Sequence, residues 1–265
     1  MRAKLVVLVL LAAGCATGTR GVRDGGLRDP SPYEFHRSLA LTMLRTEQAS
    51  LALDHIRTLQ RLAPRRAEPY LLLGRAYSQL GVTEQAREMF ERAVALDGQQ
   101  AGAHAALGVL LDGIGDAAGA EREHRRAIAL APENPAYENN LGFSLFAQGR
   151  YAEATAAYER ALALDAGLRR THNNVGFAYG RLGALERAES HFRLAGSTAE
   201  SQNNLGLVLE ARGELERAHD HYRAAVASDR SLAEPRANLA RVCERLGRPV
   251  PALPAGATPT QGVEP

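Results

Sequence analysis

Three asparagine doublets are the residues best suited, by type and spacing, to recognise a ligand. They are Asn139-Asn140, Asn173-Asn174 and Asn203-Asn204. An asparagine amide has two donor hydrogens and one acceptor oxygen, so it can pair with both sides of a peptide bond whatever the neighbouring side chain. Phenylalanine follows the first two doublets, and such aromatic neighbours would add apolar contact. This combination suits recognition of an extended peptide or of a helix.

The amino terminus has the pattern of a secretory signal with a lipid attachment site. Arg2 and Lys4 are basic, residues 5–11 are all apolar, and three small residues precede Cys15. The apolar run is too short to cross a bilayer. Small residues directly before a cysteine resemble the lipobox of bacterial lipoproteins, which implies that Cys15 of a 1–15 signal peptide is acylated and becomes the anchored amino terminus. The alternative is an ordinary signal peptide cut close to this point, which would give a soluble periplasmic protein.

Two segments without apolar periodicity flank the middle of the chain. Residues 16–32 contain six glycine or proline residues and are predicted to form a flexible tether. Residues 248–265 hold five of the twelve prolines and are predicted to form a disordered tail.

Charge and cysteine content exclude two classes of protein. The chain has 32 basic and 30 acidic residues, and two of the basic residues lie in the predicted signal, so the mature protein would be neutral. Nucleic-acid-binding proteins usually carry a basic excess, so we expect no nucleic-acid partner. Two cysteines are too few for a disulfide framework, and Cys243 falls at an apolar position of the last predicted helix.

Pairs of small residues recur along the chain at a fixed interval. The pairs are Leu39-Ala40, Leu73-Gly74, Leu107-Gly108, Leu141-Gly142, Val175-Gly176, Leu205-Gly206 and Leu239-Ala240. Successive pairs are 34 residues apart except for one interval of 30, and from the second pair onward a glycine follows seven residues after the last residue of the pair. Self-similarity of this period predicts a repeat architecture.

The unit resembles the tetratricopeptide repeat, a helix–turn–helix motif of 34 residues, from about Tyr33 to Gly247. The resemblance implies an all-α, right-handed superhelix of six repeats and a C-terminal capping helix, since one unit cannot bury its apolar face alone. The predicted units are 33–66, 67–100, 101–134, 135–168, 169–198 and 199–232, with the cap at 233–247.

Residue types within the unit predict how its two helices meet. The glycine of each small pair is expected to face the first alanine of the second helix, and bulky residues such as Tyr158 and Phe192 are expected to fill the space between units. The later glycines, such as Gly149, are expected to take the left-handed conformation that ends the first helix.

The fifth unit is four residues short. Its second helix is predicted to end near Ala195 and Gly196, and residues 197–200 are predicted to form a capping box for the next helix. The deletion is either absorbed on the convex side or changes the superhelical pitch locally.

The family resemblance also implies which residues face a partner, since positions 2, 5, 9 and 12 of each tetratricopeptide unit line the inner groove. The predicted groove residues are Arg75, Asn139, Phe143, Phe146, Arg170, Asn173, Phe177, Asn203 and Leu207. The asparagines at position 6, which are Asn140, Asn174 and Asn204, are assigned a structural role between units. A mature chain without lysine lacks the lysine-rich clamp with which chaperone-binding members hold a terminal carboxylate.

No group of residues has the arrangement of a catalytic or metal site. His219 and His221 are two residues apart on a predicted helix and would point in different directions. Four further histidines fall at packing positions of the repeat, and charge pairs such as Glu121 and Arg125 are expected on solvated faces. We therefore predict a protein that is not an enzyme and has no cofactor, metal site or small-molecule substrate.

The combination of lipobox, tether and six repeats resembles the pilotin lipoproteins of type IV pili and the repeat lipoprotein of tight-adherence (Tad) pilus and secretion loci. The resemblance implies a non-catalytic outer-membrane lipoprotein that faces the periplasm and binds a segment of a secretin or other pilus component. A different class stays open, namely a soluble periplasmic scaffold that recruits an envelope enzyme such as one acting on peptidoglycan.

Overall fold

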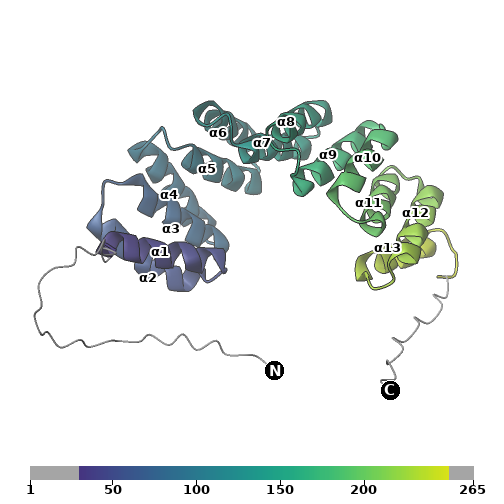
Figure 1. Ribbon diagram of the computed structural model, residues 1–265, viewed down its shortest axis with the longest axis horizontal. Helices are drawn as coiled ribbons and strands as arrows, with labels where there is room; N and C mark the ends of the chain where they lie inside the picture. The colour runs from purple at the N-terminus through teal and green to yellow at the C-terminus, as the bar shows by residue number, and fades with distance from the viewer. Residues whose placement is uncertain (1–29, 251–265) are drawn as a thin grey trace, which may run out of the picture.

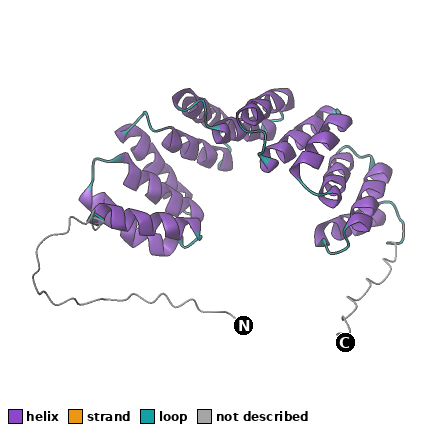
Figure 2. Cartoon of the chain, in the orientation of Figure 1, coloured by secondary structure: helices purple, strands orange, loops and turns teal. Residues whose placement is uncertain are grey.

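A computed structural model describes residues 30–250 of the protein. Within this range the chain forms thirteen α-helices and no strand, and short loops join the helices (Figure 2). Consecutive helix pairs stack side by side into an arch (Figure 1). The helices are α1 (Pro32–Arg45), α2 (Ala49–Leu62), α3 (Ala67–Gln79), α4 (Thr83–Leu96), α5 (Ala101–Gly113), α6 (Ala117–Leu130), α7 (Pro135–Ala147), α8 (Tyr151–Leu164), α9 (Arg169–Leu182), α10 (Leu185–Ala195), α11 (Thr198–Ala211), α12 (Leu215–Ser228) and α13 (Ala233–Arg245).

The predicted all-α superhelix of helix–turn–helix units is confirmed. Each predicted unit holds one helix pair, and α13 packs on the last pair. The first helix begins at Pro32, the last residue of the predicted tether, because Ser31 caps it by accepting from the backbone N–H of Glu34 over 3.3 Å. The predictions for Cys15, for most of the tether and for the tail beyond Val250 lie outside the described residues. No helix between residues 30 and 250 has the length and apolarity needed to cross a membrane.

The turn glycines adopt the conformation that the sequence predicts. Gly149 has a φ of 76° and Gly183 a φ of 83°, which favour glycine because a side chain would be strained there. Gly81, Gly115 and Gly213 also have positive φ angles, so a left-handed glycine ends the first helix of five units.

The glycines of the small pairs leave room for a ring from the second helix of the same unit. A Cβ atom added to Gly142 would lie 2.6 Å from ring atoms of Tyr158, so the glycine receives the ring of its own unit. The same holds for Gly176 and Phe192. Tyr158 and Phe192 therefore fill the crossing within a unit, because their rings extend to the position where the glycine has no side chain. Both rings also lie in a core cluster that spans the fourth, fifth and sixth units.

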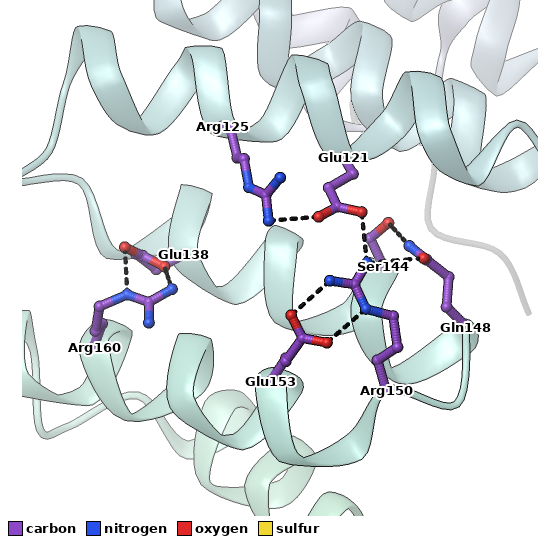
Figure 3. A network of polar contacts seen from close by, with 8 residues as sticks. All are labelled: Glu121, Arg125, Glu138, Ser144, Gln148, Arg150, Glu153 and Arg160. Atoms are coloured by element: carbon purple, nitrogen blue, oxygen red, sulfur yellow. Dashed lines mark hydrogen bonds and ion pairs between the residues drawn. The ribbon is translucent and has the colours of Figure 1, made fainter.

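An ion-pair network ties the third unit to the fourth (Figure 3). Arg150 bonds Glu121 of α6 and Glu153 of α8, each over 2.6 Å. Glu121 also pairs with Arg125, but its side chain is only 14% exposed, so the expectation of a solvated pair is wrong for this carboxylate. Its burial follows from its place at the junction between units.

Candidate partner-binding groove

Asparagines of neighbouring units are joined to one another through their side chains. The Nδ2 group of Asn204 donates to Oδ1 of Asn173 over 2.7 Å, and that of Asn174 donates to Oδ1 of Asn139 over 3.1 Å. Asn139 Oδ1 also accepts from the hydroxyl of Thr171 over 3.0 Å. We call the Asn139–Asn174 pair the first asparagine bridge and the Asn173–Asn204 pair the second.

Each of these bridges has hydrogen-bonding groups left over. Within residues 30–250, the Nδ2 groups of Asn139 and Asn173 have no partner, and neither do the Oδ1 atoms of Asn174 and Asn204. All four residues are partly exposed. Each bridge thus presents one donor and one acceptor, which together match the C=O and N–H groups of a peptide backbone.

A third asparagine bridge, between Asn203 and Asn238, differs because its groups are occupied. Asn238 Nδ2 donates to Asn203 Oδ1 over 2.8 Å, Asn203 Nδ2 reaches Glu234 at 3.4 Å, and Asn238 Oδ1 accepts from Arg241 over 2.8 Å. Asn203 is 4% exposed. This bridge fastens the capping helix and leaves little for a ligand.

The asparagines at position 5 and those at position 6 of the repeat therefore do not have separate roles. Asn174 and Asn204 bond the preceding unit, which confirms the structural role predicted for them. Asn140 does not, because the residue that would receive its bond is Ala105; its amide has no partner in the described part of the chain and lines a hollow. The position-5 residues Asn139 and Asn173 combine a structural oxygen with an open donor.

The predicted aromatic groove residues differ in how firmly they are held. Phe143 is 54% exposed and free to contact a partner. Phe146 packs edge-on against Tyr151 with ring centres 5.2 Å apart, and Phe177 packs edge-on against Phe192 at 5.0 Å. These ring contacts hold Phe146 and Phe177 in place. Leu207, the remaining apolar groove residue, is partly buried and packs against the core cluster formed by α11, α12 and α13.

Two hollows lie along the groove, and the second asparagine bridge lines one of them. The first helices α1, α3, α5 and α7, together with Phe90 of α4, line a hollow of about 770 Å³ that is bordered by Arg75, Val109 and Asn140. Helices α9, α10, α11 and α13 line a cavity of about 540 Å³ that contains Arg170, Asn173 and Asn203. The structure thus brings the predicted Arg170, Asn173 and Asn203 to one site and leaves Arg75 in another.

Histidines are used as packing groups. His172 Nε2 lies 3.1 Å from the carbonyl of Ala166, so this nitrogen carries the hydrogen, and Nδ1 accepts from His191 Nδ1 over 3.0 Å. Burial, and then the nearby His172, lower the pKa of His191. His124 is fully buried beneath Gly108 and bonds Asp112 over 2.9 Å. Within residues 30–250 no three metal-ligating side chains gather.

Reasoning from the sequence missed Thr171, Glu234 and Asn238 as members of the asparagine network. Asn238 occupies position 6 of the capping helix, as Asn204 does in the sixth unit, so the repeat register could have identified it. Thr171 and Glu234 carry no comparable signal, because their contacts depend on how neighbouring helices are staggered.

Family models of the tetratricopeptide repeat match residues 67–100, 144–183 and 198–230. The crystal structure of PilW, described as a widely conserved type IV pilus biogenesis factor, is similar with a TM-score of 0.68 and 19% identity over 80% of this chain and 100% of that one. MamA from Desulfovibrio magneticus RS-1 is similar with a TM-score of 0.53 and 20% identity, over 70% and 97% of the two chains. These identities support a shared fold alone. No curated protein matches the chain.

Proposed function

Because the chain is a tetratricopeptide-repeat protein, we propose that it is a non-catalytic scaffold whose groove binds an extended segment of a pilus or secretin component. Acylation at Cys15 would hold the scaffold at the outer membrane, facing the periplasm. The repeat array supplies a protein-binding surface, and the membrane anchor would fix where that surface meets its partner.

The observation that carries this proposal is the pair of open asparagine bridges. Asn139 and Asn173 are held by Asn174 and Asn204, so their orientation is fixed before a ligand arrives. A preorganised donor costs less conformational entropy on binding than a mobile one. The open donor and acceptor of each bridge can pair with the C=O and N–H groups of a peptide backbone, which suits an extended segment.

The cellular setting rests on two further observations. Cys15 follows a short apolar run and three small residues, as in bacterial lipoproteins. The fold is similar to that of PilW, a type IV pilus biogenesis factor, over the full length of that protein. Both favour an envelope protein that assists assembly of a pilus or secretin.

Site-specific photo-crosslinking in living cells tests the groove. A benzoylphenylalanine at Phe143, which is exposed, should crosslink a secretin or pilus component that mass spectrometry identifies. The matched control carries the same group at Ser190, an exposed residue of the second helix α10, and should not. Identical products from both positions, together with normal pili in a deletion strain, would contradict the proposal.

Labelling with radioactive palmitate tests the anchor. The wild-type protein should incorporate label and fractionate with the outer membrane, and Cys15→Ser should do neither. An unlabelled wild-type protein that crosslinks an enzyme acting on peptidoglycan would instead support the soluble scaffold.

A further inference from the structure

The shortened fifth repeat leaves a cavity. Helix α10 has 11 residues, whereas α8 and α12, which hold the same place in neighbouring units, have 14. After Ala195 the chain passes through Gly196 directly into Ser197, the N-cap of α11. The cavity of about 540 Å³ lies against Phe192, Ala195 and Gly196, where the missing turn of helix would have been.

The acidic residues in this cavity already serve the fold. Glu200 accepts from the backbone N–H of Ser197 over 2.7 Å and completes a capping box. Glu234 lies in the first turn of α13 and receives Asn203 Nδ2 at 3.4 Å. Both carboxylates sit at helix amino termini, where the helix dipole stabilises negative charge.

The two arginines of this cavity do not both have hydrogen-bond partners. Arg169 donates from Nε to the carbonyl of Ala195 over 2.7 Å and closes the end of α10. Hydrogen bonds with Ser197, and then the nearby Arg169, lower the pKa of the Glu200 carboxyl. Arg170 has no partner among residues 30–250 and is exposed. Helix α9 begins with both arginines and has no acidic residue in its first turn. Their positive charges therefore stand at the positive end of a helix, an arrangement that an incoming anion would relieve.

We infer that this cavity receives the side chain of an aspartate or glutamate from the segment bound in the groove, with Arg170 as its partner. The inference rests on the proposed function and adds a side-chain preference to it. Asn173 and Asn204 line the same cavity, so a backbone held by the second asparagine bridge would place a neighbouring side chain beside Arg170. A guanidinium can hold a carboxylate through two parallel hydrogen bonds, which an amide or an ammonium group cannot receive.

Fluorescence anisotropy with three labelled peptides tests this preference. The peptides share the sequence Ser-Thr-Leu-Thr-Xaa-Thr-Leu-Thr-Ser and carry Glu, Gln or Lys at Xaa. The wild-type protein should bind the Glu peptide about threefold to tenfold more tightly than the other two at low salt, and high salt should reduce the difference. Arg170→Gln should abolish the preference, whereas Arg223→Gln, which changes an exposed arginine of the second helix α12 outside this cavity, should retain it.

A second variant fills the cavity. Replacing residues 196–198 with the seven residues 162–168 of the fourth unit restores a repeat of 34 residues and should also abolish the preference. Equal binding of the Glu, Gln and Lys peptides to the wild-type protein, or a preference that survives Arg170→Gln, would overturn the inference. If Asn173→Asp abolishes binding of all three peptides, that result would still support backbone binding in the groove. The proposed function and the side-chain preference can therefore fail separately.

Discussion

Asn204 donates from Nδ2 to Oδ1 of Asn173 over 2.7 Å, so a residue of the sixth repeat orients a groove residue of the fifth. This bond gives the two atoms of the Asn173 amide different tasks. The oxygen joins the repeats, and the nitrogen, which has no partner within residues 30–250, is left for a ligand. Substitutions that change one atom and not the other can therefore separate stability from binding.

Asn173→Asp should preserve the fold and impair partner binding. Aspartate keeps an oxygen for Asn204 but has no Nδ2 donor, so we expect a change in unfolding free energy under about 0.5 kcal/mol and about tenfold weaker partner binding. Asn173→Ala removes both atoms and should in addition cost about 1 kcal/mol of stability. Urea denaturation followed by circular dichroism, and the yield of the Phe143 crosslink, measure the two effects.

Asn203→Ala is the control for the two Asn173 variants, because the hydrogen-bonding groups of the third asparagine bridge already have partners. Asn203 is 4% exposed and bonds Asn238 and Glu234, so its loss should lower stability by about 1–2 kcal/mol and leave the crosslink yield unchanged. An Asn173→Asp protein that unfolds as readily as Asn203→Ala and binds normally would show that the second asparagine bridge is structural only.

The repeat array was predictable because its signals are local and periodic. Gly149 and Gly183 fix a backbone conformation that their own turns require, and the register follows from them. The use of each asparagine was harder to predict, because it depends on which residue the next unit presents. Asn140 and Asn174 occupy the same position of the repeat, yet only Asn174 has an asparagine opposite it, and Asn140 faces the space beside Ala105. The cavity at the fifth repeat likewise depends on how neighbouring helices close around the deletion.

Gly142→Ala should destabilise the fourth repeat. The new Cβ would lie 2.6 Å from the ring of Tyr158, which is 1% exposed and has no room to move, so we expect a loss of about 1–3 kcal/mol. Gly113→Ala is the matched control, since this helical glycine has nothing within 4 Å of an added Cβ and should be unchanged or slightly more stable. Urea denaturation of both variants measures the difference, and equal stabilities would contradict the tight crossing between α7 and α8.

Acid should release the capping helix through Glu210. Bonds from Arg241, and then from Tyr222 and Arg245, lower the pKa of this carboxyl from 4.5 to about 2. A lowered pKa means that the stabilisation is complete above about pH 4.5 and is lost as the pH falls toward 2. Glu210→Gln should therefore cost roughly 2–3 kcal/mol at neutral pH and progressively less between pH 4.5 and 2.

Melting temperatures across this pH range test the role of Glu210. Glu216→Gln is the control, because its bond to Arg248 joins two exposed side chains and should contribute under about 1 kcal/mol. If Glu210→Gln and the wild-type protein differ by the same amount at pH 3 and pH 7, the ionised carboxyl does not hold α13.

The histidine pair of the fifth repeat should make stability depend on pH in a milder range. Burial, and then His172, lower the pKa of His191, so the stabilisation is complete above the ordinary histidine pKa of about 6.5 and is lost as the pH falls below it. The second repeat has Tyr70 and Met89 at the same two positions. A protein with His172→Tyr and His191→Met should therefore lose less stability than the wild-type protein between pH 7 and pH 5. Thermal unfolding between pH 7 and pH 5 measures how steeply stability falls with pH. His219→Gln is the control and should fall as steeply as the wild-type protein. If the double variant also falls as steeply, other groups cause the pH dependence.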